Sequence, residues 1–129
     1  MVPHVFSPVV GSGPLYAASF GETGGISYRG SREEGGWYYV KVLWLADPTY
    51  RGPVLIRGKQ LDGPHVLRFG EGPHPTAELQ LPPGDGRAAT TAPGWSNWPT
   101  YTRVRAPGCY AYQVDGLDFS EIIVVPAQG

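Results

Sequence analysis

The most apolar segment of the chain lies between the glycine pair at 35–36 and the Asp-Pro turn at 47–48. Residues 37–45 read Trp-Tyr-Tyr-Val-Lys-Val-Leu-Trp-Leu, so both alternating faces of an extended strand are largely apolar. On one face Lys41 joins Trp37 and Tyr39. A strand that is apolar on both faces lies in the interior of a layered β protein. The pattern therefore predicts a central strand here.

Shorter segments with the same two-residue period follow, each bounded by Gly, Pro or Asp. We expect strands over residues 53–61, 66–69, 77–81, 98–105, 109–114 and 119–125. The last two flank Asp115-Gly116, a dipeptide that supports the positive φ angles of tight hairpin turns. Residues 82–94 are polar and rich in Gly and Pro, which predicts a long mobile loop.

The N-terminal part is punctuated by prolines at positions 3, 8 and 14. Proline is excluded from central ladders, so residues 2–10 and 15–20 are predicted to be edge strands. No segment has apolar residues at helical spacing. About eight or nine short strands joined by turns predict an all-β fold, a two-sheet antiparallel β-sandwich that is immunoglobulin-like or related, with a closed β-barrel as the alternative. No repeat or linker is evident, which predicts a single domain over 1–129.

Charge excludes some classes of partner. Ten Lys and Arg residues against eleven Asp and Glu residues give a net charge of −1, without a basic stripe in the sequence. This argues against nucleic acid and anionic membranes as partners. No apolar run is long enough to cross a bilayer, and residues 1–8 lack the pattern of a signal peptide. A preference for Arg over Lys and the proline-rich loops are features of heat-tolerant proteins, although genome composition also produces such a preference for Arg.

The residues that carry chemistry are few and dispersed. Cys109 is the single cysteine and is predicted to be a small buried hydrophobe. His4, His65 and His74 have no zinc-type spacing, and neither His nor Met follows Cys109, as a blue-copper site would require. No serine has a Gly-x-Ser-x-Gly setting. We therefore predict no metal, no cofactor and no catalytic residue.

Two blocks of the sequence stand out by their residue order. One is Pro-Gly-Cys-Tyr-Ala-Tyr-Gln-Val-Asp-Gly over residues 107–116, followed by an apolar strand over 119–124. The other is Tyr-Arg-Gly-Pro-Val-Leu-Ile-Arg-Gly-Lys-Gln-Leu-Asp-Gly over 50–63. Together they resemble a bacterial family of small β-sandwich proteins, many of which are exported or lipid-anchored, so the resemblance implies a location outside the cytoplasm. The Pro-Gly-x-Tyr-x-Tyr spacing is also similar to that of cupredoxins and immunoglobulin-like domains, which implies structural roles for Tyr110 and Tyr112.

The segment Gly-Trp-Ser-Asn-Trp-Pro-Thr-Tyr over residues 94–101 is rich in aromatic residues. Aromatic side chains on a surface stack on sugars or anchor partner proteins, because they bury a large area at little entropic cost. Candidate ligand-binding residues are therefore Trp95, Trp98, Tyr101 and Arg103. The alternative, which the usual burial of large aromatic side chains favours, is that Trp95 and Trp98 cover an open end of the sandwich.

Three functions are compatible with this sequence. The first is a non-catalytic binding or structural module of the bacterial cell envelope or extracellular space, which binds protein or carbohydrate. The second is a subunit of a homo-oligomeric or filamentous assembly, in which residues 1–10 add as a strand to a neighbouring sheet. The third is an enzyme without a recognisable motif, which a cluster of His65 or His74 with carboxylates would indicate.

Overall fold

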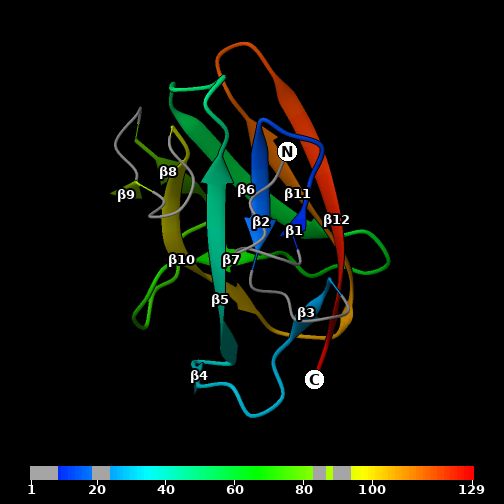
Figure 1. Ribbon diagram of the computed structural model, residues 1–129. Coiled ribbons are helices and arrows are strands. Elements are labelled where there is room, and N and C mark those ends of the chain that lie inside the picture. Colours follow the sequence, from blue (N-terminus) through cyan, green and yellow to red (C-terminus); the bar gives the residue numbers. More distant parts are fainter. Residues whose placement is uncertain (1–8, 19–23, 83–86, 89–93) are drawn as a thin grey trace.

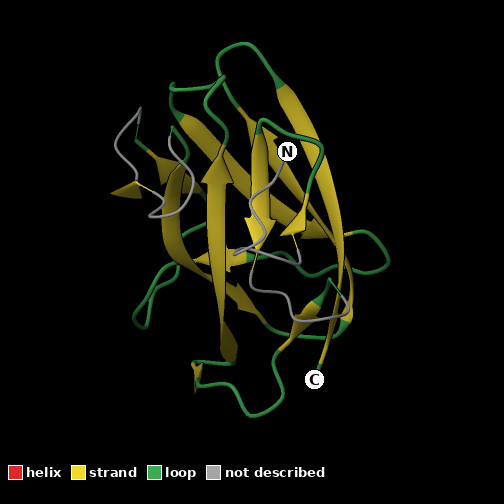
Figure 2. Cartoon of the chain, in the orientation of Figure 1, coloured by secondary structure: helices red, strands yellow, loops and turns green. Residues whose placement is uncertain are grey.

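The computed structural model describes residues 9–18, 24–82, 87–88 and 94–129. All regular secondary structure in these ranges is β-strand, as Figure 2 shows. Gly and Pro separate the strands, because they interrupt ladders and favour turns. Within the described ranges, no helix has the length and apolar character that crossing a membrane requires.

Twelve strands follow one another along the described parts of the chain. They are β1 (Val9–Val10), β2 (Leu15–Ala18), β3 (Ile26–Ser27), β4 (Glu33–Glu34), β5 (Trp37–Ala46), β6 (Val54–Gln60), β7 (Arg68–Phe69), β8 (Leu79–Leu81), β9 (Arg87–Ala88), β10 (Ser96–Val104), β11 (Gly108–Asp115) and β12 (Ser120–Gln128).

The strands form two sheets that pack face to face (Figure 1). Sheet A has the order β1-β2-β5-β10-β7, with β4 also paired to β5 and β9 to β10. Sheet B has the order β3-β12-β11-β6-β8. All pairs are antiparallel except β3 with β12, which is parallel. The predicted all-β sandwich is therefore confirmed, with one parallel pair at the edge of sheet B.

Several predicted strands differ in their extent or position. β2 lies between β1 and β5, so the prediction that residues 15–20 form an edge strand is wrong. Pro14 precedes the first residue of β2, so its missing N–H removes no bond from the ladder. The pattern also does not predict β3 and β4, because a two-residue strand carries no period.

Two predicted segments fall largely on residues that the structure does not describe. Of the N-terminal arm, only Val9 and Val10 are described, as β1 at the edge of sheet A. Strand addition by this arm stays a prediction. Of the predicted loop over 82–94, the described part includes β9, which pairs with Ser96 and Asn97 of β10.

The core lies between the two sheets, and contacts between aromatic side chains stabilise it. Trp44 of β5 is fully buried and meets the ring of Tyr112 of β11 edge-on, with centroids 5.1 Å apart. The Tyr112 hydroxyl lies 2.9 Å from Oγ1 of Thr102, so a hydrogen bond joins the two sheets inside the core. Tyr110 is also buried and donates to the carbonyl of Ala106 at 2.7 Å. Both tyrosines thus tie β11 to its surroundings, as expected.

The predicted hairpin joins β11 to β12, but its turn differs from the expected type. A four-residue loop is closed by the Gly116 N–H, which donates to the Phe119 carbonyl at 2.9 Å. Gly116 is not among the glycines with positive φ. Instead, a Cβ at this position would overlap the ring of Phe119. Glycine is needed here for close packing of the ring rather than for a left-handed backbone.

Candidate functional site

The outer face of sheet A gathers aromatic and basic side chains from three strands. The register places Lys41 of β5 opposite Tyr101 of β10, and Tyr39 opposite Arg103. On the other side of β10, Arg68 of β7 also lies opposite Arg103. We call this surface the aromatic–basic face; its members are Arg32, Trp37, Tyr39, Lys41, Arg68, Tyr101, Arg103 and Arg105.

Arg103 forms the floor of the aromatic–basic face and is fully buried. Its Nη1 donates to the carbonyls of Gly70 at 3.1 Å and Gly72 at 2.9 Å, and its Nη2 donates to that of Glu34 at 3.2 Å. Its guanidinium carbon lies 3.8 Å from the ring centroid of Tyr39. A planar guanidinium has donors in its plane and an apolar face above it, so it satisfies both kinds of neighbour. Arg103 therefore joins the 70–72 loop and β4 to the sheet.

Tyr39 lies between two guanidinium groups. The Arg32 guanidinium carbon is 4.3 Å from its centroid, and Arg32 and Arg103 flank Tyr39 from opposite sides of β5. The hydroxyl of Tyr39 donates to Glu34 Oε1 at 2.7 Å and accepts from the Gly72 N–H at 2.8 Å. The same carboxylate pairs with Arg32 at 3.5 Å. Because its hydroxyl is hydrogen-bonded on both sides and its ring contacts two guanidinium groups, Tyr39 is a rigid support for this part of the face.

Tyr101 stands on this support and is half-buried. Its ring meets that of Tyr39 edge-on, with centroids 5.3 Å apart and an interplanar angle of 86°. Lys41, directly across the strand pair, is exposed. Further along the face, the guanidinium of the exposed Arg105 lies 4.2 Å from the ring of Trp37. The accessible members are thus aromatic rings flanked by cations.

The predicted binding residues are only partly brought together. Tyr101 and Arg103 share the outer face, but Arg103 is buried and its Nη atoms bond to backbone carbonyls. Trp95 is half-buried against Tyr16, with centroids 5.7 Å apart. Trp98 lies opposite Trp44 and packs against the core from the inner face. The segment therefore divides between the two faces of β10.

Sequence reasoning missed most members of the aromatic–basic face. Lys41 and Trp37 share one side of their strand, and Tyr101 and Arg105 share one side of theirs. Both facts follow from the alternation of residues along a strand. The missing information was that β5 and β10 are neighbours, and at what register. This is why the sequence shows no basic stripe although five of the ten cations meet on one face.

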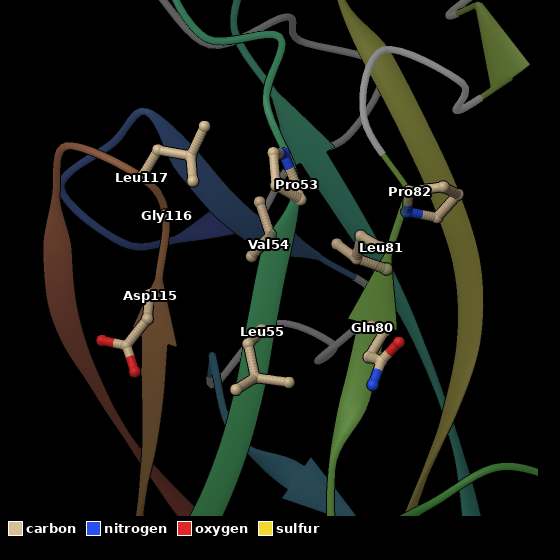
Figure 3. A pocket seen from close by; sticks show the side chains of 9 residues that line it. All are labelled: Pro53, Val54, Leu55, Gln80, Leu81, Pro82, Asp115, Gly116 and Leu117. Atoms are coloured by element: carbon tan, nitrogen blue, oxygen red, sulfur yellow. The ribbon is translucent and has the colours of Figure 1, made fainter.

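A second candidate is an open cleft at one end of sheet B. Figure 3 shows this cleft, of about 580 Å³, where the ends of β6 and β8 approach the β11–β12 turn. Its volume lies in the range of small-molecule sites. Leu117, which also lines the cleft, is 79% exposed. The apolar lining residues are Pro53, Val54, Leu55, Leu81, Pro82 and Leu117.

The charged group beside this cleft is already engaged. Asp115 accepts hydrogen bonds from Ser120 Oγ at 2.6 Å and from Gln113 Nε2 at 3.0 Å, and Arg57 lies 3.5 Å away. These contacts hold the pKa of Asp115 below its usual range, and the hydrogen bond from Ser120 has the largest effect. The cleft thus offers apolar contact, while its carboxylate has little capacity left to orient a ligand.

Carboxylates gather at a third hollow, of about 280 Å³, between the 12–14 and 47–50 segments. Asp47 and Asp118 line it. The neighbouring Glu121 is buried and accepts hydrogen bonds from the N–H groups of Ser12 and Leu15, both at 3.2 Å. Burial raises the pKa of Glu121. This carboxylate holds the chain before β2 against β12.

The other residues with catalytic potential lie apart. His74 is exposed and His65 is half-buried, while His4 lies outside the described residues. In the described ranges, no hydrogen bond or ion pair links either imidazole to a carboxylate, and no three His, Cys, Asp or Glu side chains could hold a metal ion together. Cys109 is half-buried rather than buried, and its N–H donates to Asp62 at 2.9 Å.

Comparison with known proteins gives one match, to a solved structure. No family model matches the chain, and no curated protein matches it. The solved structure is that of "a Putative Lipoprotein from Bacillus anthracis". The two chains are 13% identical and superpose with a TM-score of 0.61, over 99% of this chain and 82% of the other. At this identity the likeness establishes the shared fold.

Proposed function

We propose that this protein is a non-catalytic binding module of the bacterial cell envelope or extracellular space, and that it binds glycans on the aromatic–basic face. The observation that carries this proposal is the setting of Tyr101. Its ring is partly exposed, and it rests edge-on against a buried Tyr39 that two guanidinium groups clamp.

A rigid aromatic ring suits sugar recognition for a physical reason. The C–H face of a sugar ring is apolar and stacks on an aromatic ring, while its hydroxyl groups need hydrogen-bond partners nearby. Lys41 lies beside Tyr101 in the register and supplies donors at the rim of the ring. Because Tyr39 and Arg103 are already fixed, little conformational entropy is lost when a ligand binds.

The setting outside the cytoplasm has two supports. The blocks over 50–63 and 107–124 resemble a family with many exported or lipid-anchored members. The solved structure with the same fold is that of "a Putative Lipoprotein". Envelope polymers and extracellular glycans are ligands that a protein in this setting meets.

Calorimetric titration with a panel of neutral and acidic hexasaccharides tests the proposal. We expect at least one class to bind the wild type, and Tyr101→Ala to weaken that binding about tenfold, since one stacked ring contributes about 1–3 kcal/mol. Tyr101→Phe keeps the ring and should retain most of the affinity. Ile122→Ala, on the exposed outer face of sheet B, is the matched control. Absence of binding to every glycan, or equal affinity for Tyr101→Ala, would refute the proposal.

A further inference from the structure

We infer that the glycan bound on the aromatic–basic face is acidic, with carboxylate or phosphate groups placed along its sugar backbone. This inference rests on the proposed function and specifies the ligand class for the same site. It is carried by an imbalance of charge that the fold creates on this one face.

The imbalance appears when each charged group on the face is paired with its neighbours. Arg32 is neutralised by Glu34 at 3.5 Å. The nearby Glu33 is committed to the Gly36 N–H at 2.5 Å. Within the described part of the chain, no carboxylate lies within 4 Å of the charged nitrogen atoms of Lys41, Arg68 or Arg105. Three accessible cations therefore lack a counter-charge.

Two of these cations border Tyr101. Lys41 is its direct cross-strand partner, at the separation of about 5 Å that neighbouring strands impose. Arg68 lies opposite Arg103, two residues along the same face, and so is a diagonal neighbour of Tyr101 within reach of a long side chain. A sugar stacked on Tyr101 would thus have one cation on each side of it.

The floor of the face adds to the same potential. Arg103 is fully buried, and its guanidinium is met by backbone carbonyls instead of a carboxylate. Carbonyl dipoles stabilise the cation without cancelling its charge, and water screens a buried charge less than an exposed one. An anion above Tyr101 therefore meets a positive potential from below as well as from both sides.

An acidic glycan fits this arrangement better than a nucleic acid does. A nucleic-acid strand presents closely spaced phosphates and is held by long basic tracks. Here the cations form one compact group on a chain with a net charge of −1. Few charges around a stacking ring match a polymer whose anionic groups are separated by sugar rings.

The test compares ligands that differ only in charge. The probes are hexameric oligogalacturonate, its fully methyl-esterified form, a phosphorylated mannohexaose, its dephosphorylated form and single-stranded oligothymidylate. At 50 mM NaCl we expect each acidic glycan to bind about tenfold more tightly than its neutral counterpart. Raising the salt to 300 mM should remove most of that preference, because added ions screen exposed charges. The pair of glycans with the larger ratio of acidic to neutral affinity identifies the preferred anionic group as carboxylate or phosphate.

Charge-removing variants locate the effect. Lys41→Gln and Arg68→Gln should each weaken binding of the acidic glycan about two- to fivefold, the range for an exposed pair of charges, and should weaken binding of the neutral glycan less. Lys59→Gln removes an exposed cation from sheet B and should have no effect. Circular dichroism melting curves verify that each variant is folded.

The possible outcomes distinguish a preference for acidic glycans from glycan binding in general. If neutral and acidic forms bind equally and Tyr101→Ala weakens both, the module binds glycans but the inference fails. Tighter binding of oligothymidylate through Lys41 and Arg68 would replace the glycan by a nucleic acid. If no glycan binds, both statements fail together.

Discussion

Replacing Arg103 provides a direct measure of what holds the aromatic–basic face together. The side chain is fully buried, donates to three backbone carbonyls and stacks on Tyr39. Arg103→Ala removes all of these contacts at once. It leaves the carbonyls of Gly70, Gly72 and Glu34 without their donor.

The expected loss of stability follows from opposing contributions. Hydrogen bonds from a charged donor contribute about 1.5–3 kcal/mol each, and the stack on Tyr39 adds about 1 kcal/mol or more. Burying the guanidinium costs several kcal/mol, and its Nε has no partner within the described residues. We therefore expect Arg103→Ala to lower the free energy of unfolding by about 2–4 kcal/mol. Arg103→Met, which keeps much of the apolar stem, should lose about 1 kcal/mol less.

Urea denaturation followed by far-ultraviolet circular dichroism measures these differences. Arg68→Ala is the control, since Arg68 lies opposite Arg103 in the sheet but forms no ion pair with the described residues, and it should change stability by less than about 0.5 kcal/mol. A loss below about 1 kcal/mol for Arg103→Ala would contradict the role as a structural floor. So would equal losses for Arg103→Ala and Arg68→Ala.

Three further predictions concern the core and the 12–15 segment. Tyr112→Phe should cost about 1–2 kcal/mol because it leaves Oγ1 of Thr102 unpaired in the core, and a double-mutant cycle with Thr102→Val should recover part of the loss. Gly58→Ala should cost about 1–3 kcal/mol in urea denaturation, since its Cβ would lie 2.5 Å from Cδ1 of the buried Leu67; an unchanged stability would show that Leu67 shifts freely. Burial raises the pKa of Glu121 in the folded state, so its contribution to stability is present below the unfolded pKa and is lost as pH rises through the folded pKa. Relative to Glu121→Gln, the wild type should therefore lose stability as pH rises above the ordinary pKa of a Glu side chain, and a difference that is flat with pH would contradict this sign.

The sequence was sufficient for features that depend on neighbouring residues. The two-sided apolar pattern over 37–45 predicts a strand with few exposed positions, and β5 has core residues on its inner face and Tyr39 and Leu45 buried on its outer face. The hairpin of β11 and β12 also follows from its own residues, because the strands that pair are adjacent in the chain. Local alternation and turn residues carry this information.

The candidate site depends on pairings between distant segments, which the local pattern does not contain. Arg103 is buried because the 70–72 loop and Glu34, both remote in sequence, supply carbonyls around it. From the sequence alone, an Arg on a strand with Tyr101 is most simply a surface residue that contacts ligand. Trp98 and Tyr101 are three residues apart on one strand, so their side chains point to opposite faces of the sheet. That separation was available from the sequence, since the predicted strand over 98–105 contains both residues.

Although the net charge is only −1, positive and negative side chains occupy different parts of the surface, and this affects ligand binding. Cations gather on the aromatic–basic face, whereas Asp47 and Asp118 line a hollow elsewhere, beside the buried Glu121. A protein with a small net charge exerts little long-range attraction on a polyanion, so an acidic ligand would feel the face only at short range. Salt should consequently weaken binding mainly through faster dissociation, with a smaller effect on the association rate. Surface plasmon resonance with immobilised oligogalacturonate separates the two rates, and a salt effect confined to association would show that the whole molecule, rather than Lys41 and Arg68, attracts the ligand.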